Sequence, residues 1–229
     1  MRDGRSPGTP SLGGAREPSR PARQPLSRQL IIEGALRLVD AESLEALTMR
    51  RLGAELGGFE AMSLYHYVTG KADVLDGVLA TVWAEMELPA EGLSCWERLA
   101  ELARSWRGLA RAHPGVLPLL ANRANYAPTA LRAVESALGA LREAGFEGPG
   151  LARAFRTLLA YVYGQASLEI LRSGDQGWGP EPWYDLSRVP AECPLIGEAA
   201  AQFTRPDDAS FEWGLQATLD GLRAGLVTP

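Results

Sequence analysis

The sequence predicts an all-α protein with two parts, a small N-terminal helical domain followed by a larger helical domain. From Ser27 onward, apolar residues recur at spacings of three and four with almost no interruption, which is the pattern of amphipathic helices. No segment alternates apolar and polar residues for long enough to indicate a strand. Short breaks rich in glycine and proline, such as residues 148–150, divide the pattern into separate helices.

The bulk composition is that of a globular protein. The chain has 229 residues, and 46% of them are hydrophobic, which is enough for a packed core. No apolar run approaches the ~18 residues of a membrane span, and no apolar segment follows the N-terminal arginines as it would in a secretory signal. We therefore expect a soluble, cytoplasmic protein. Cys95 and Cys193 lie far apart and outside any metal-binding spacing, which favours two unpaired thiols over a redox-sensing pair.

Charge is distributed unevenly along the chain. The net charge is −5, but residues 1–71 contain ten basic and eight acidic side chains, whereas the remainder contains 13 basic and 20 acidic ones. An acidic protein of this kind can still present a locally basic surface. Residues 1–26 are rich in glycine, proline and serine and have a charge of +3, so we expect a disordered basic arm there. An inert tail and an arm that contacts DNA both fit this composition.

The periodicity predicts four helices in the N-terminal part. Ser27 and Thr48 stand where N-caps are expected for the first two helices, because a side-chain oxygen there can accept from a free backbone N–H. Gly57 and Gly58 end the second helix. The four helices are expected at residues 27–42, 48–56, 61–68 and 71–86.

The C-terminal part continues the helical pattern between clear breakers. These are the His113–Pro114 pair, Pro128 and Gly145. Residues 173–190 contain too much glycine and proline for regular structure, and their aromatic residues fit either a lid or an anchored loop: Trp178, Trp183 and Tyr184. Helices are expected at residues 94–112, 115–121, 128–145, 150–172, 191–204 and 209–226.

Three short helices, with a tight glycine-containing turn between the second and third, follow the helix-turn-helix plan. We place this domain at residues 27–72 and the larger helical domain at residues 73–229. On a helical projection of the third helix, Ala61, Leu64 and Val68 face the core, and Met62, Ser63 and His66 face outward with Tyr65 and Tyr67 on the flanks. Aromatic residues at helical spacing are usually core residues, but residues 65–67 span roughly 200° and cannot all point inward.

This arrangement suits a protein that reads DNA. The outward stripe can face base edges, and the flanking tyrosine hydroxyls can reach phosphates. Lys71, the only lysine among 23 basic residues, begins the fourth helix, where free backbone N–H groups also attract phosphate. Arg50, in the first turn of the second helix, can reach a guanine edge.

The stretches "ALTMRRLGAELG" and "AMSLYHYVTGKADVLDGV" resemble the DNA-binding domain of the TetR (tetracycline repressor) family of bacterial transcription regulators. "LREAGF" and "FEWGLQATLDGLRAG" resemble, more weakly, the tetracycline-repressor type of C-terminal domain. The resemblance implies a homodimer that pairs through helices near 150–172 and 209–226, binds a palindromic operator and responds to a small-molecule inducer. It also implies DNA contacts by Thr48, Arg50, Met62, Ser63, Tyr65, His66, Tyr67 and Lys71.

The chain departs from the family pattern at several positions. The turn at residues 57–64 is one residue longer than usual, which can shift the recognition helix. Ser43 stands where the family often has glycine, so we expect a strained or re-routed helix end there. Leu119 stands where the tetracycline repressor has a metal-binding histidine, and Glu169, which resembles a second group near that metal, does not make a magnesium site alone. We therefore predict no tetracycline binding, no metal site and no cofactor.

Function follows from the motifs that are present. His66 and His113 are the only histidines, His113 is expected as a helix C-cap, and no nucleophile–base, phosphate-loop or metal motif is found, so an enzyme is disfavoured. A ligand-responsive repressor is favoured over an activator and over a helical module that binds a protein partner. Ligand binding is expected to move the helix that begins at Lys71.

Polar and aromatic groups on the apolar helices of the larger domain are candidates for ligand binding. Exposure on the surface, or a hydrogen bond within the core, also explains each of them: Trp106, Asn122, Arg123, Tyr126, Tyr161, Gln165 and Glu169.

Overall fold

The structure is a computed structural model that describes residues 25–124, 126–171, 185–199 and 207–226. These residues form α-helices and two short 3₁₀ turns and contain no strand, so the all-α prediction is confirmed. The helices are α1 Arg28–Ala41, α2 Met49–Glu55, α3 Ala61–Leu64, α4 Lys71–Ala84, α5 Cys95–Ala112, α6 Leu117–Asn122, α7 Pro128–Glu143, α8 Gly148–Leu171, α9 Pro194–Ala199 and α10 Asp208–Gly225, with 3₁₀ turns η1 Pro114–Val116 and η2 Leu186–Arg188.

The two predicted N-caps are confirmed. The Ser27 hydroxyl accepts a hydrogen bond from the Leu30 backbone N–H at 3.1 Å, and the Thr48 hydroxyl accepts one from the Arg51 backbone N–H at 3.1 Å. Each bond satisfies a backbone donor that has no partner within the helix. The caps therefore fix where α1 and α2 begin.

The turn between α2 and α3 depends on glycine. Gly57 and Gly58 both have left-handed backbones, with φ of 98° and 82°, which other residues rarely adopt. Phe59 then folds back so closely that its carbonyl oxygen lies 2.2 Å from where a Cβ on Gly53 would stand. The close approach sets the angle between α2 and α3, the core of the helix-turn-helix unit.

The end of α1 matches one of the two alternatives expected from the sequence. The helix ends at Glu42 in a right-handed conformation, and no described residue other than glycine has a left-handed backbone. The Ser43 hydroxyl accepts a hydrogen bond from the Ala46 N–H at 3.4 Å and starts the turn toward α2. Of the two expected alternatives, the structure has the re-routed end and not the strained one, because a turn with a hydroxyl hydrogen bond takes the place of a glycine ending.

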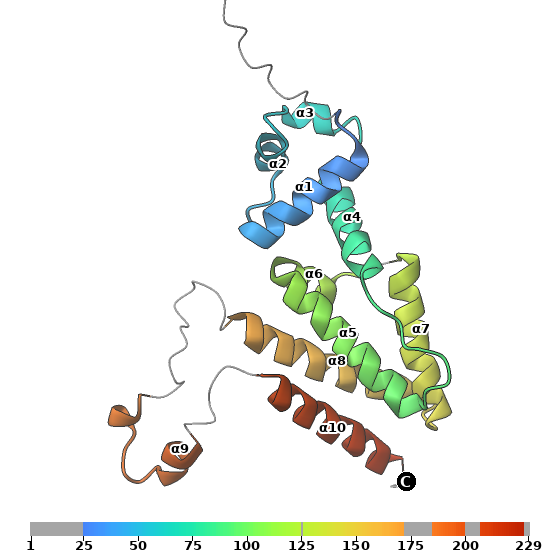
Figure 1. Cartoon of the computed structure of the whole chain (residues 1–229), viewed down its shortest axis with the longest axis vertical. Coiled ribbons are helices and arrows are strands. Elements are labelled where there is room, and N and C mark those ends of the chain that lie inside the picture. The colour runs from blue at the N-terminus through green and yellow to red at the C-terminus, as the bar shows by residue number, and fades with distance from the viewer. Residues whose placement is uncertain (1–24, 125, 172–184, 200–206, 227–229) are drawn as a thin grey trace, which may run out of the picture.

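Helix α4 joins the N-terminal unit to the larger helical domain. It packs against α1 at one end and against α6 and α7 at the other (Figure 1). Gly77 permits the first contact, because a Cβ there would lie 2.4 Å from the Cδ1 of Ile32. Val74, Val78 and Val82 are fully buried along α4, so one continuous core runs through the junction.

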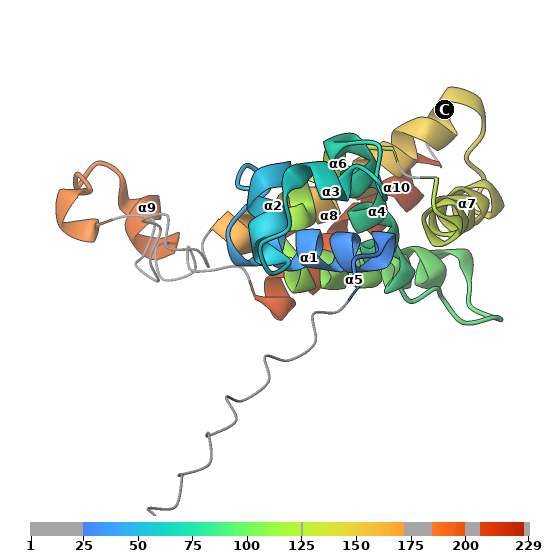
Figure 2. The same cartoon turned by 90° about the horizontal axis from the view of Figure 1, so that it is seen from above.

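The larger domain is built around α5, α7 and α8. These three helices pack against one another, and α10 lies alongside α8 on the side away from the N-terminal unit (Figures 1 and 2). Ser94 and Glu97 form a capping box that starts α5. Helix α9 stands apart from the body and has no buried residue (Figure 2).

The predicted boundaries differ from the structure at the third helix and at the helix predicted for residues 191–204. The predicted third helix ends at Leu64, after which turn hydrogen bonds from Tyr67 and Val68 to the Leu64 carbonyl continue to residue 68. The predicted helix at 191–204 is α9, and residues 200–206 lie outside the described part, as do the arm at 1–24 and residues 172–184 with Trp178, Trp183 and Tyr184. No helix in the described ranges has the length and apolar character needed to cross a membrane.

Candidate nucleic-acid interface and ligand cavity

The outward side of α3 and the turn that follows it form an exposed surface. Leu64 and Val68 are buried, with 0% and 3% exposure, whereas Met62 is 71%, Tyr65 47% and Tyr67 44% exposed. His66 is exposed, and Ser63 and Ala61 are half-buried. The burial agrees with the helical projection for Leu64, Val68, Met62 and His66, whereas Ala61, predicted to face the core, and Ser63, predicted to face outward, are both half-buried. We call exposed Met62, Tyr65, His66 and Tyr67 the α3 surface.

Helix α2, which packs against α3, carries Arg50 in its first turn. Its neighbour Arg51 is engaged, since it pairs with Glu42 and, at 3.3 Å, with Glu55. Arg50 is exposed and forms no ion pair with any described residue. Thr48 is also exposed, but its hydroxyl already accepts the capping hydrogen bond.

Lys71 begins α4 directly after the α3 surface. Its side chain is exposed and makes no ion pair within the described ranges. The nearby carboxylate of Asp73 is directed elsewhere, because it accepts a hydrogen bond from the Thr69 N–H at 2.9 Å and pairs with Arg28. The Thr69 hydrogen bond and then the Arg28 charge keep the pKa of Asp73 below its usual range. Lys71 therefore offers a positive charge at a helix N-terminus that is held in no ion pair with a described residue. Glu45 is its electrostatic neighbour, since hydrogen bonds at Glu45 and Ser43, and then the charge of Lys71, lower the pKa of the Glu45 carboxyl.

The seven predicted ligand-binding residues do not lie together but fall into three groups. Asn122, Arg123 and Tyr126 border a surface depression beside α4. Arg123 pairs there with Asp76 at 2.6 Å, and Tyr126 is 81% exposed. Because this depression is on the surface and its arginine is already neutralised, it offers little that could hold a small molecule.

Tyr161 and Glu169 belong to the packing of α10 and α5 against α8. The Tyr161 hydroxyl donates to the Phe211 carbonyl at 2.6 Å, and burial raises the pKa of this phenol. Buried Glu169 accepts a hydrogen bond from the Arg107 Nε at 2.9 Å. The Arg107 Nη2 lies 2.7 Å from a carboxylate oxygen of Glu169 and 2.9 Å from one of Asp208. Its N–H bonds do not point at either oxygen with hydrogen-bond geometry, so the attraction is chiefly electrostatic.

The charged neighbours of Glu169 disfavour a metal ion at its carboxylate. Two arginines, Arg107 and Arg111, face its carboxylate, at 2.7 Å and 3.6 Å. Cationic neighbours of this kind take the place that a metal ion would need. Leu119 is buried among apolar residues. Within the described ranges no three histidine, cysteine, aspartate or glutamate side chains are grouped so that they could hold a metal ion.

Trp106 and Gln165 lie in the interior of the larger domain. The Trp106 ring is buried and meets the Tyr163 ring edge to face, with centroids 6.3 Å apart. Gln165 is half-buried, and its Oε1 is covered without a hydrogen-bond partner in the described part of the chain.

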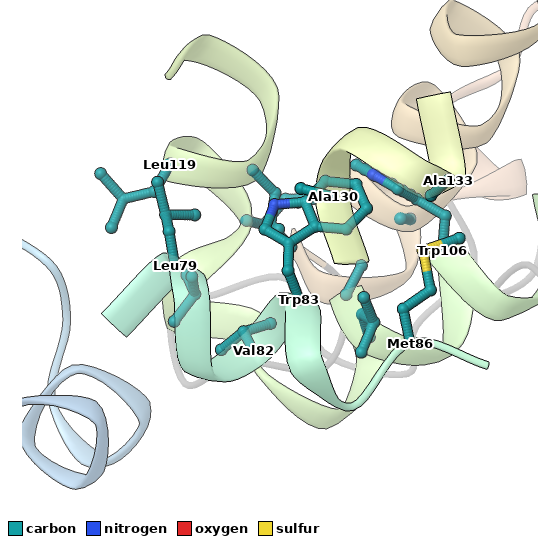
Figure 3. Packing of buried hydrophobic residues seen from close by; sticks show 14 of the residues in the cluster. Leu79, Val82, Trp83, Met86, Trp106, Leu119, Ala130 and Ala133 are labelled. Atoms are coloured by element: carbon teal, nitrogen blue, oxygen red, sulfur yellow. The ribbon is translucent and has the colours of Figure 1, made fainter. Parts of the chain in front are cut away.

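Trp106 lines an apolar cavity of about 60 Å³ between α5, α7 and α8. Figure 3 shows Met86, Trp106 and Ala133 converging on this region from three different segments. The complete lining is Met86, Leu102, Ala103, Trp106, Ala133, Val134, Ala137, Phe155, Leu158, Leu159 and Val162. We call this the α5–α8 cavity.

Sequence reasoning found only Trp106 of these lining residues, because it searched for polar groups on apolar helices. One pattern could have indicated the cavity. Ala130, Ala133 and Ala137 recur at spacings of three and four along α7 and are all buried. A stripe of small side chains on a buried helix face leaves space between helices unless the opposite face fills it.

Comparisons with known proteins agree with this architecture. Residues 88–226 match the family model described as the tetracyclin repressor-like C-terminal domain. The chain is 34% identical over 219 residues to the HTH-type transcriptional repressor DrrR1 of Streptomyces coeruleorubidus, a match that covers 90% of this chain and 81% of that protein.

Solved structures are similar as well. The crystal structure of apo ActR from Streptomyces coelicolor aligns with a TM-score of 0.71 and 32% identity, covering 90% of this chain and 98% of that one. ActR in complex with actinorhodin aligns with a TM-score of 0.71 and 29% identity, covering 88% and 97%. The sequence-based resemblance is confirmed: this chain belongs to the TetR family of transcriptional regulators.

Proposed function

We propose that this protein is a cytoplasmic transcriptional repressor that binds a palindromic operator as a homodimer and releases it when a small-molecule inducer binds the larger domain. The observation that carries the proposal is the α3 surface. Three large side chains, Met62, Tyr65 and Tyr67, remain exposed on a segment whose other side is fully packed. Exposed apolar and aromatic groups in such number are costly unless a partner covers them.

The proposed DNA contacts divide by chemistry. Met62, Ser63 and His66 face the base edges in the major groove, where apolar and hydrogen-bonding groups discriminate base pairs. Tyr65 and Tyr67 reach phosphates from the two flanks, and Lys71 binds a phosphate at the start of α4. From α2, Thr48 contacts the backbone and Arg50 reaches a base edge.

The proposed dimer interface is the outer face of α8 and α10. Trp213 is 78% exposed on α10, and Leu168 is 37% exposed on α8. Small exposed residues share their helix faces: Ala160 lies eight residues before Leu168 on α8, and Ala217 and Gly221 lie four and eight residues after Trp213 on α10. Small residues allow two helix pairs to approach closely, and two copies of α8 and α10 then make a four-helix bundle.

The proposed inducer site is the α5–α8 cavity. Support comes from the position of Met86, which lines the cavity only two residues after the end of α4. A ligand that displaces Met86 would move α4 and, through α1, the α3 surface. A coupling of ~1–3 kcal/mol would change operator affinity about 5–150-fold. Structures of ActR with actinorhodin and with (S)-DNPA give precedent for small-molecule binding in this family.

Fluorescence anisotropy with labelled DNA from the region upstream of the protein's own gene tests the proposal. We expect salt-dependent binding, and Arg50→Ala should weaken it by about 1–3 kcal/mol, the value of a base-contacting arginine. Arg142→Ala, on exposed α7, is the matched control and should bind as the unmodified protein does. Failure to bind any such duplex at low ionic strength would refute the proposal.

A further inference from the structure

The α5–α8 cavity has a chemically uniform wall. All eleven lining residues are apolar, with Trp106 and Phe155 as the aromatic ones, and none carries a charge. Leu102, Trp106 and Leu158 are each at most 6% exposed, so the deeper part of the wall is shielded from water. A molecule held there exchanges water for hydrocarbon on the side that faces this wall.

Among the described residues, the buried or partly buried cations on α5 next to this wall are already paired. The neighbouring charges are exposed on the outer sides of their helices: Arg132, Glu135 and Arg156. The buried charge closest in the chain to Trp106 is Arg107, which is committed to Glu169 at 2.7 Å and stacks on the Phe211 ring at 4.2 Å. Arg98, earlier on α5, pairs with Glu143. A carboxylate or ammonium group in the cavity would therefore lose its hydration and gain no partner, which is strongly unfavourable.

The other hollows of the larger domain have a different character. The groove along α5 is lined by Glu85, Glu87, Glu101 and Arg104, and the depression beside α4 by Asp76 and Arg123. Both are larger, about 570 Å³ each, and both have charged side chains in their linings. The α5–α8 cavity is thus the place where an apolar molecule gains the most from burial.

We infer, on the basis of the proposed function, that the inducer is an uncharged, predominantly apolar ring compound that occupies the α5–α8 cavity between Trp106 and Phe155. Organic acids, amines, nucleotides and peptides are excluded as occupants by the uncharged wall. Aromatic side chains on α5 and α8 favour a flat ring, because ring faces and edges pack well against each other.

The cavity must enlarge to hold such a compound. Its volume is about 60 Å³, whereas a dry protein cavity that holds benzene has about 150 Å³. Met86 is the adaptable part of the wall, since methionine is unbranched and changes rotamer easily. Val134, 36% exposed at the edge of the lining, marks where the cavity nears the surface. Enlargement at Met86 places the structural change next to α4.

Two matched probes test whether the cavity excludes charged compounds, with the full chain and without DNA. 2-Naphthol is uncharged at neutral pH, and 2-naphthoate has the same ring system with a carboxylate. Isothermal titration calorimetry should give at least about tenfold tighter binding of 2-naphthol, since each tenfold corresponds to about 1.4 kcal/mol. Equal or tighter binding of 2-naphthoate, or no binding of 2-naphthol up to its solubility limit, would overturn the inference.

A cavity-filling pair tests the location. Ala133→Leu adds bulk at the lining and should weaken 2-naphthol binding at least about tenfold, whereas Ala90→Leu, at an exposed position outside the lining, should leave it unchanged. Ala133→Val is the smaller change if the leucine variant does not fold. Unchanged binding in a folded Ala133 variant would overturn the site. These titrations do not involve DNA, so an unsuccessful operator assay remains a separate result.

Discussion

His113 joins three segments that are distant in sequence. Its Nδ1 lies 2.8 Å from Asp40 on α1, and its Nε2 lies 2.9 Å from Glu85 at the end of α4, while His113 itself caps α5. Ionised carboxylates only accept hydrogen bonds, so the His113 ring satisfies both of them when it is protonated to the imidazolium, in which both ring nitrogens donate. The residue predicted as a simple helix cap is thus an ionic bridge between the N-terminal unit and the larger domain.

The charge of this bridge depends on pH. Partial burial lowers the pKa of His113, but the hydrogen bonds and charges of Asp40 and Glu85 outweigh it and hold the pKa above its ordinary value of 6.5. Burial raises the pKa of Asp40 more than His113 lowers it, which affects only the acid range. A raised histidine pKa stabilises the fold fully below 6.5, and this stabilisation is lost as the pH rises through the folded-state pKa.

We therefore predict that the free energy of unfolding declines as the pH rises above 6.5 and through the raised folded-state pKa of His113. His113→Gln should remove this slope and lower stability by about 1–3 kcal/mol at the acid end, because the bridge is lost. Urea titrations across the pH range measure both effects. His66→Gln replaces the other, exposed histidine and should keep the slope; if it abolished the slope instead, the assignment to His113 would be wrong.

At the level of elements, α1 of the N-terminal unit and η1 of the larger domain pack against each other with close backbone contact. A Cβ on Gly115 would lie 2.2 Å from the Val39 carbonyl oxygen. The obstacle is backbone, which cannot rotate away as a side chain can. The contact therefore fixes how the N-terminal unit sits on the larger domain.

Gly115→Ala should lower the free energy of unfolding by about 1–3 kcal/mol, because α1 and η1 must separate. Gly108→Ala is the matched control, since no atom lies within 4 Å of its added Cβ. That change should stabilise α5 by roughly 0.5–1 kcal/mol, as alanine favours helix more than glycine. Thermal unfolding of both variants measures the difference, and equal effects would show that the joint is not tightly packed.

Helices and caps were largely predictable because they depend on local sequence. Ser27, Thr48 and the glycine breakers act within a few residues, so the periodic pattern places α1, α2 and α10 closely. The short α3 is the exception, since the helical pattern continues to Val68 while the chain turns after Leu64. That ending is imposed by packing between segments, which a single segment's pattern does not contain.

The α5–α8 cavity, the proposed inducer site, was less predictable for a similar reason. Its walls come from α5, α7, α8 and Met86, and residues that share no local pattern meet there only after folding. A search for polar groups instead selected Arg123, Tyr161 and Glu169. Each of these side chains already has a partner within the chain: Arg123 pairs with Asp76, the Tyr161 hydroxyl donates to the Phe211 carbonyl, and Glu169 pairs with Arg107. An apolar site leaves little trace beyond the alanine stripe of α7.

At the scale of the whole molecule, the proposed binding of an operator by two N-terminal units depends on the proposed pairing of two larger domains. The α3 surface and the exposed face of α8 and α10 lie at opposite ends of the chain's long axis (Figure 1). A dimer formed at one end therefore sets the distance between the two DNA-binding surfaces at the other. A single unit would contact only half of a palindrome and lose the gain from simultaneous binding.

Trp213→Glu places a charge in the centre of the proposed dimer interface, where it would be buried against the partner's apolar face. We expect sedimentation velocity to show a monomer, and operator affinity to fall on the order of 10²-fold or more. Tyr126→Glu adds the same charge at an aromatic residue with 81% exposure far from this face, and it should remain dimeric. Circular dichroism should be the same for both, since Trp213 points away from the folded core. If the Trp213 variant stays a dimer with full operator affinity, the pairing face must lie elsewhere, because no protein interface tolerates an unpaired buried carboxylate at its centre without loss.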